Sequence, residues 1–410
     1  MEWETGKLSD LVVFQRGFDI TKARQVEGKV PIISSSGITS FHNVAKQIGP
    51  AIIIGRKGTL GSVHFYSGEY WPHDTTLWSK EIKGDPRFVY YLLQTMKLEQ
   101  YDVGNANPTL NRNHIHRLDV PIPPPTIQQK IAHILSAYDD LIENNLKRIK
   151  LLEEMAQITY EQWFIRMKFP GHETTPIDAE TGLPEGWSHL SVGSLLQHEI
   201  GGGWGKEELS QEFSESAYVI RGTDFDGLST GELSNVPYRY HKKSNLASRK
   251  LKHGDIIFEV SGGSHYAGVA RNAFVDGELL EQLNDSVMCA SFCKLVRADE
   301  LRNAYLLYHF FKFLRSIKAT EVFEIRSASN IVNYNWTAFL KFQQIPFPAD
   351  VISNEFQELV APIHKQLYQL GKQNQLLKEA RDILLPRLMT GMINVDKIEL
   401  PTPKQDTEAA

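Results

Sequence analysis

The chain has 410 residues, of which 41% are hydrophobic and 23% charged, and its net charge is −5. This length exceeds the ~250–300 residues at which a single core stops growing, so more than one domain is predicted. No apolar run approaches the ~18 residues that cross a bilayer, and the first ten residues lack a signal-peptide pattern. The two cysteines, Cys289 and Cys293, exclude a disulfide framework and fit a reducing, cytoplasmic location. With this acidic balance, DNA binding would require local basic patches or a partner chain.

The first 125 residues are predicted to form a mixed α/β region. Short β-rich runs, separated by Gly, Ser and Asn turns, occur at 30–33, 51–54 and 62–66. Apolar residues then recur at helical spacing near 86–99. A second such region follows later in the chain, with its own helix predicted near 300–317.

Two long helices are predicted, one starting near Thr126 after Pro123-Pro124-Pro125 and one near Ser353 after Pro348. In both, apolar positions alternate in steps of four and three residues, the 3.5-residue average of a coiled-coil seam. About 40 residues at ~1.5 Å each give a rod of roughly 60 Å. The first seam comprises Ile131, Leu135, Tyr138, Ile142, Asn145, Ile149, Leu152, Ala156, Thr159 and Trp163. The second comprises Phe356, Val360, Ile363, Leu367, Leu370, Asn374, Leu377, Arg381, Leu384 and Leu388.

Each seam contains one asparagine, Asn145 or Asn374. An antiparallel pairing that places these two opposite each other aligns every other seam position and sets Tyr138 against Arg381. A buried polar residue in a seam costs stability but fixes the register. Alternatively, each asparagine faces water.

The chain also contains an internal repeat. Pro123 and Pro348 are 225 residues apart, as are Leu152 and Leu377. Upstream, Trp3 with Leu8 corresponds loosely to Trp187 with Leu190, and the run 51–55 corresponds to 255–258. A duplicated half-molecule is therefore predicted, in the order globular region, long helix, globular region, long helix.

Catalytic signatures are incomplete. Gly201 to Lys206 looks like a phosphate loop, but Glu207 stands where the magnesium-binding Ser or Thr is needed. Asp74, Glu81 and Lys83 only superficially resemble a nuclease set. His114 and His116 have no neighbouring ligand to complete a metal site. The chain is therefore predicted to have no catalytic centre and no metal site of its own.

The long helices carry a specific resemblance. The run from Leu376 to Gly391, LLKEARDILLPRLMTG, resembles the distal conserved region of type I restriction–modification specificity subunits. The run from Ile122 to Phe164 resembles their central conserved region, and Ile53 to Gly61 resembles a segment of their target-recognition domains. The corresponding Glu259-Val260-Ser261-Gly262-Gly263 departs from that last segment.

This resemblance implies an α+β fold with two mixed α/β target-recognition domains, joined by two long antiparallel coiled-coil helices with pseudo-two-fold symmetry. The predicted boundaries are 1–125 for the first domain, 126–170 for the central helix, 171–349 for a linker and the second domain, 350–395 for the distal helix, and 396–410 for a polar tail. The resemblance also implies a non-catalytic subunit that reads a bipartite, asymmetric DNA target. The helices would set the unread spacer between the two parts.

The implied partners are double-stranded DNA, two methyltransferase subunits and up to two restriction subunits. S-adenosylmethionine, ATP and magnesium are expected to bind to those partner subunits, and no cofactor is expected on this chain. Adenine methylation, which requires the base to leave the stack, is the usual chemistry of such partners. Two alternatives remain: a coiled-coil scaffold that does not read sequence, and a stand-alone nuclease or methyltransferase.

The candidate DNA-binding residues carry groups that bind phosphates or base edges. Arg binds guanine bidentately and Asn binds adenine, each worth ~1–3 kcal/mol of discrimination. In the first domain the candidates are Arg16, Lys22, Arg24, Arg56, Lys57, Thr59, Arg112, Asn113 and His114. Alternatively, each of these residues has a purely structural role and does not contact DNA.

The clearest basic patch runs from Tyr238 to His253, with six Lys or Arg and no acid. Its cations would neutralise phosphates, unless the run is merely a solvated loop. They are Arg239, Lys242, Lys243, Arg249, Lys250 and Lys252. The glycine-rich loop with Trp204 and Lys206 would allow close backbone approach to a phosphate, or is a plain turn. Further candidates in comparable loops are Ser264, His265, Tyr266, Arg271 and Arg326.

Overall fold

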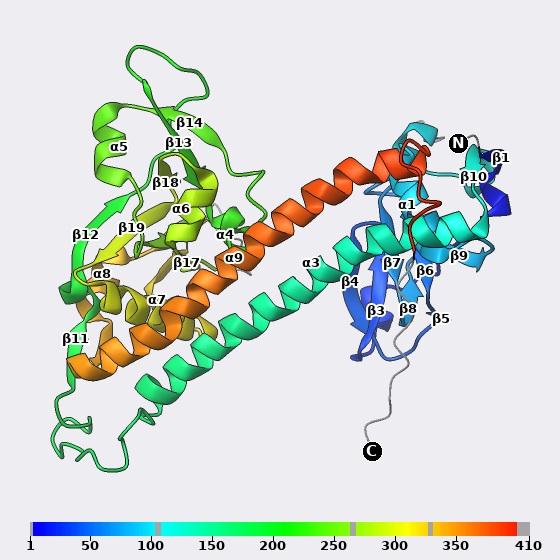
Figure 1. The fold of residues 1–410 in the computed structure, drawn as a ribbon. Coiled ribbons are helices and arrows are strands. Elements are labelled where there is room, and N and C mark those ends of the chain that lie inside the picture. The colour runs from blue at the N-terminus through cyan, green and yellow to red at the C-terminus, as the bar shows by residue number, and fades with distance from the viewer. Residues whose placement is uncertain (1–2, 103–107, 263–267, 327–330, 400–410) are drawn as a thin grey trace. The chain divides into compact units, whose positions relative to one another are not determined.

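The computed structural model describes residues 3–102, 108–262, 268–326 and 331–399 (Figure 1). The chain divides into two compact units. The first unit comprises residues 1–141 and 377–410, and the second comprises residues 142–376. Each of the two long helices therefore contributes residues to both units. No helix in the described ranges is long and apolar enough to span a membrane.

The first unit contains three small sheets. A two-stranded sheet pairs β1 with β10, and the two four-stranded sheets have the orders β2-β9-β6-β7 and β4-β3-β8-β5. The strands are β1 (Glu4–Lys7), β2 (Val12–Arg16), β3 (Val30–Ser34), β4 (Gly37–His42), β5 (Gln47–Ile48), β6 (Ala51–Gly55), β7 (Val63–Tyr66), β8 (Glu69–Pro72), β9 (Thr76–Ile82) and β10 (Asp119–Ile122). The β-rich runs predicted at 30–33, 51–54 and 62–66 are thus confirmed as β3, β6 and β7.

Helix α1 (Pro86–Thr95) begins where the sequence predicts a helix. Asp85 caps it by accepting a hydrogen bond from the Phe88 amide, and Pro86 occupies the first turn, where a missing N–H costs nothing. Its buried side chains, among them Phe88 and Leu92, join β2 and β6 in one hydrophobic core. A second short helix, α2 (Arg112–Ile115), precedes β10.

The second unit has the same plan with insertions. Its sheets have the orders β11-β22, β12-β19-β15-β17, β14-β13-β18 and β16-β21-β20. The strands are β11 (Ser188–Ser191), β12 (Leu196–Gly201), β13 (Glu215–Ile220), β14 (Tyr238–His241), β15 (Ile256–Glu259), β16 (Ser261–Gly262), β17 (Asn272–Phe274), β18 (Val287–Cys289), β19 (Cys293–Ala298), β20 (Glu324–Arg326), β21 (Val332–Tyr334) and β22 (Gln344–Phe347). The helices are α4 (Phe225–Leu228), α5 (Lys243–Arg249), α6 (Gly277–Leu283), α7 (Leu301–Ser316) and α8 (Trp336–Phe342).

The predicted internal repeat is confirmed by strand order. The sheet β2-β9-β6-β7 of the first unit corresponds strand for strand to β12-β19-β15-β17 of the second. The parallel pair β3-β8 corresponds to β13-β18, with β4 and β14 antiparallel at the same side. Trp3 and Trp187 directly precede the equivalent strands β1 and β11.

The two long helices are α3 (Pro125–Tyr160), which continues as a π-helical turn (Glu161–Ile165), and α9 (Asp350–Met389). In the first unit Ile131 and Leu135 of α3 share a core with Leu388 of α9. In the second unit Ile149 of α3 packs with Leu367 and Leu370 of α9. Both sets agree with the predicted antiparallel register.

The seam asparagines are both buried, with 6% of Asn145 and 0% of Asn374 exposed, so neither faces water. Neither Oδ1 nor Nδ2 of Asn374 has a hydrogen-bond partner in the described part of the chain. A buried amide without partners costs about 1–3 kcal/mol. The register role of the pair therefore stays a prediction consistent with this burial. In the first unit Arg381 forms an ion pair with Asp139, the residue after Tyr138, at 2.6 Å.

A buried polar network joins α7 to both long helices in the second unit. His309 Nε2 lies 3.2 Å from His364 Nε2, and His309 Nδ1 lies 3.1 Å from Gln157 Oε1. Burial lowers the pKa of His309 well below its ordinary value and lowers the pKa of His364 to about 3, with Lys312 adding to both shifts. Both histidines are therefore neutral in the folded chain at neutral pH.

This network predicts acid sensitivity of the second unit. Unfolded histidine binds a proton near pH 6.5 and the folded pair does not, so stability is intact above that pH and is lost as the pH falls below it. The loss should be about 1.4 kcal/mol per pH unit for each histidine. We expect the urea midpoint of the chain to fall between pH 7 and pH 5, and to fall less in His364→Gln. An equal fall in both proteins would contradict this explanation.

Candidate DNA interface

Three loops converge at the same edge of the equivalent sheets in the two units. In the first unit, Arg16 ends β2, Arg56 follows β6, and Asp74 precedes β9. In the second unit, Gly201 ends β12 and Glu259 ends β15. Because β2, β6 and β9 are neighbours in one sheet, their ends bring residues distant in sequence together.

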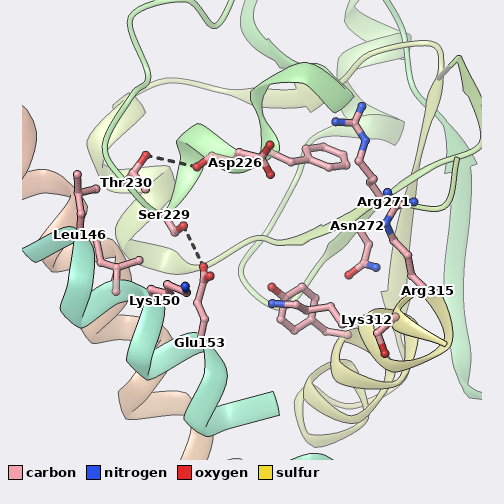
Figure 2. A pocket seen from close by; sticks show the side chains of 14 residues that line it. Leu146, Lys150, Glu153, Asp226, Ser229, Thr230, Arg271, Asn272, Lys312 and Arg315 are labelled. Atoms are coloured by element: carbon pink, nitrogen blue, oxygen red, sulfur yellow. Dashed lines mark hydrogen bonds between the residues drawn. The ribbon is translucent and has the colours of Figure 1, made fainter. Parts of the chain in front are cut away.

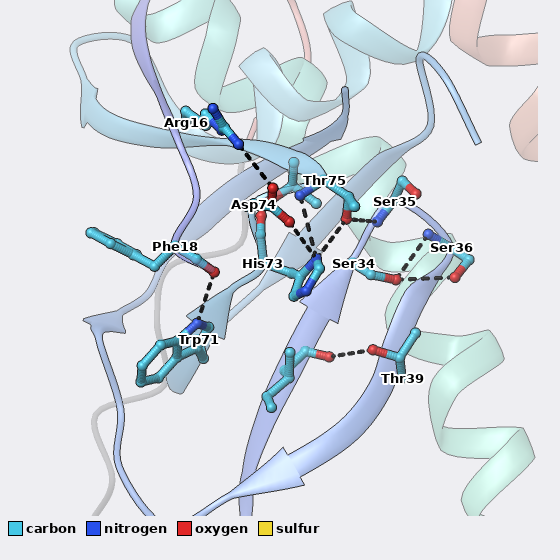
Figure 3. Close-up of polar contacts among 12 residues, drawn as sticks. Arg16, Phe18, Ser34, Ser35, Ser36, Thr39, Trp71, His73, Asp74 and Thr75 are labelled. Carbon is cyan, nitrogen blue, oxygen red and sulfur yellow. Dashed lines mark hydrogen bonds and ion pairs between the residues drawn. The ribbon is translucent and has the colours of Figure 1, made fainter. Parts of the chain in front are cut away.

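At the first-unit edge, Arg16 and His73 point toward the Asp74 carboxylate (Figure 3). Arg16 Nη2 donates to Asp74 Oδ2 at 2.9 Å, and His73 Nδ1 lies 3.2 Å from Asp74 Oδ1. Burial, and then the charge of Arg16, lower the pKa of Arg56, while Asp74 acts in the opposite direction. Arg56 Nη1 is buried and has no hydrogen-bond partner in the described ranges. A phosphate would supply both an acceptor and a negative charge, and a guanine edge would supply the acceptor.

Asp19, His73 and Asp74 bring three potential metal ligand atoms within 4.8 Å of one another. Arg16 already occupies Asp74 Oδ2, and a guanidinium at that oxygen competes with a cation. We therefore assign these side chains to the arginine cluster.

The remaining DNA-binding candidates of the first domain lie in two places in the structure. Leu110, just before α2, donates its amide to the Arg56 carbonyl at 3.0 Å, which ties the α2 segment to the Arg56 loop. The exposed candidates of these two segments are Lys57, Thr59, Arg112, Asn113 and His114. Lys22 and Arg24 lie on a separate exposed turn. His116 has a structural contact, since its Nε2 accepts the Phe14 amide hydrogen bond at 2.9 Å.

In the second unit, the glycine-rich loop and the basic patch form one surface. The backbones of Lys206 and Tyr240 exchange two hydrogen bonds of 2.9 Å. The Arg239 guanidinium lies over the Trp204 ring, 4.9 Å from its centroid, and Arg239 Nη1 pairs with Glu207 at 2.6 Å. The glycine-rich loop and the basic patch, which are separate in the sequence, are therefore neighbours in the fold.

Folding brings acids to a patch that contains none in its own sequence. Lys242 pairs with Glu212, and Arg249 Nε donates to the Gly201 carbonyl at 2.9 Å. The other three cations are exposed and have no ion pair within 4 Å in the described ranges: Lys243, Lys250 and Lys252. The sequence could not show this because Glu207 and Glu212 come from the preceding loop.

A cavity of about 830 Å³ opens beside this surface, and the sequence did not predict it. Trp204 and Phe292 lie among its lining residues, and both are exposed, Phe292 at 61%. Glu259, only 4% exposed, also lines the cavity and accepts two hydrogen bonds from Arg271, 2.9 Å from Nε and 2.7 Å from Nη2. The available signal was a glutamate that ends an otherwise apolar strand. Arg326 is exposed and lies 3.4 Å from Glu324, whereas Ser264, His265 and Tyr266 lie outside the described residues.

Comparison with known proteins agrees with this duplicated plan. The family model described as "Type I restriction modification DNA specificity domain" matches residues 1–154. The MjaIX specificity subunit of Methanocaldococcus jannaschii is 27% identical, over 76% of this chain and 70% of that protein. The MjaVIII specificity subunit of the same organism is 20% identical, over 97% of this chain and 94% of its own length. Over most of its length, the chain is similar to the specificity subunits of type I restriction–modification systems.

A solved structure has the same fold. The type I S subunit of M. genitalium superposes with a TM-score of 0.59 at 14% identity, covering 95% of this chain and 96% of that one. The comparisons support neither the scaffold nor the stand-alone nuclease alternative.

The exposed lysines of the basic patch give a direct test of DNA contact. Replacing Lys243, Lys250 and Lys252 by Gln should weaken binding to duplex DNA and flatten its salt dependence by up to about 0.9 log units per lost phosphate contact. The measurement is fluorescence anisotropy at several salt concentrations. The matched control replaces three exposed lysines of the same unit, Lys318, Lys341 and Lys372. An unchanged slope in the patch variant would remove this surface from the interface.

Proposed function

We propose that each α/β domain reads one part of a bipartite, asymmetric DNA target through the loops at its sheet edge. The observation that carries this proposal is that the two domains share one arrangement of strands but present different side chains at the equivalent sheet edge. The first domain presents Arg16 and Arg56 around Asp74, and the second presents Arg271 bound to Glu259 beside Trp204. Equivalent strands with different side chains suit two different half-sites.

The long helices, of 36 and 40 residues, would hold the two reading edges at a constant spacing. A spacer set by helices is indifferent to the base pairs it spans, so the middle of the target would go unread. Methylation and ATP-driven cleavage would belong to other chains. We propose two methyltransferase subunits and up to two restriction subunits, which would supply S-adenosylmethionine, ATP and magnesium.

Single substitutions at the two edges should relax different halves of the target. Arg56→Gln should reduce sequence preference in one half by about 1–3 kcal/mol at one position, and Trp204→Ala should affect only the other half. The measurement is selection of bound sequences from a randomised duplex by the assembled complex. Lys80→Gln, an exposed cation on β9, is the control. Equal loss of preference across both halves in each variant would contradict separate reading.

The outer face of α3 is the proposed docking site for a methyltransferase subunit. Leu151, Met155 and Ile158 recur at spacings of four and three residues, and they are 64%, 48% and 57% exposed. An apolar stripe that stays exposed beside a buried seam is typical of a protein interface.

Charge placed on that stripe should prevent assembly. Leu151→Glu with Ile158→Glu should lower methyltransferase affinity at least about tenfold, because burying a carboxylate is costly. Size-exclusion chromatography of the mixed subunits measures it. The conservative pair Leu151→Met with Ile158→Met should assemble normally. Normal assembly of the glutamate variant would place the interface elsewhere.

A further inference from the structure

A second cavity in the second unit lies between α3, the segment after α4, β17 and α7 (Figure 2). Its volume is about 620 Å³, within the range of small-molecule sites. Lys150 and Glu153 line it from α3, and Lys312 lines it from α7. Arg271 and Arg315 also line the cavity beside Trp204, so they separate the two spaces.

Cations outnumber acids in the lining of this cleft. Lys150, Arg271, Lys312 and Arg315 contribute four positive charges, against the carboxylates of Glu153 and Asp226. Glu259 neutralises Arg271, and Lys150 lies 3.8 Å from Glu154 on the same helix. Burial, and then the charge of Arg271, lower the pKa of Arg315, as expected where like charges are close together.

The charge of Lys312 faces this cleft, and Tyr308 first and then Glu153 raise its pKa against the effect of burial. Lys312 is half-buried and has no ion pair within 4 Å in the described part of the chain. Its Nζ lies over Tyr308, 5.4 Å from the ring centroid. Glu153, the acid across the cleft, already accepts a hydrogen bond of 3.1 Å from Ser229 Oγ. A partly desolvated ammonium in this position favours an anionic ligand.

Asn272 adds an unmet acceptor to the same cleft. Its Oδ1 is buried and has no hydrogen-bond partner in the described ranges. An unmet acceptor beside a lysine that has no ion pair within 4 Å in the described ranges suits a ligand that carries both a negative group and a hydrogen-bond donor. We propose that this cleft binds a nucleotide phosphate, with Lys312 at the phosphate and Asn272 accepting from a donor of the base or sugar.

The phosphate has two sources, a free nucleotide or a nucleotide of a DNA strand, and the test separates them. In the first arm, adenosine monophosphate is added to the full chain at constant ionic strength. At a tenfold excess over its Kd it should raise the wild-type Tm by about 3 °C. Lys312→Gln should abolish the rise, and Asn272→Asp should do so without a change in volume. Lys341→Gln, an exposed lysine outside the cleft, should keep it.

In the second arm, duplex binding by the assembled complex is measured with the same variants. A strand phosphate in the cleft predicts that Lys312→Gln weakens target and unrelated duplexes alike and reduces the salt slope by about one. This arm rests on the proposed DNA reading, and failure of the wild type to bind any duplex would count against that function instead. The cleft proposal is overturned if adenosine monophosphate leaves the wild-type Tm unchanged and Lys312→Gln binds DNA with the slope of Lys341→Gln.

Discussion

Both units complete their hydrophobic cores with the same two helices. In the first unit, Ile131 and Leu135 of α3 and Leu388 of α9 close the core built by α1 and the β2-β9-β6-β7 sheet. In the second unit, Tyr160 of α3 and Phe356 of α9 pack with α7. The main core of each α/β domain therefore includes residues of both long helices, and changes in the seam reach both domains. The buried asparagines, which cost stability, are understandable in a seam whose register both domains share.

At both sheet edges, arginines lie close to carboxylates, but the residues differ between the two units. The first places Arg16 and Arg56 near Asp74, and the second places Arg271 and Arg315 near Glu259, Glu324 and Asp226. Like charges held this close favour an added anion, and DNA supplies one at every phosphate. At the first edge, the local excess of cations suits DNA although the net charge of the chain is −5.

Much of the architecture could be predicted from the sequence because it depends on periodicity. The 3.5-residue pattern gave the two helices and their register, and the repeated proline segments gave the duplication. The contacts of the basic patch could not be predicted, since Glu207 and Glu212 reach Arg239 and Lys242 only after the chain folds back. The pairing of Glu259 with Arg271 could not be predicted either, although the glutamate at the end of an apolar strand was a local signal. Among the candidate residues, those next to strand ends were brought together, whereas Lys22 and Arg24, on a turn of their own, were not.

The central claim is that this chain alone determines which DNA sequence its system modifies. Modified-base sequencing of the source genome, with the gene intact, deleted and restored, tests it most directly. The account predicts that one methylated motif, made of two unlike parts separated by an unread spacer, disappears on deletion and returns on restoration. A methylation pattern that is the same in all three strains would contradict it.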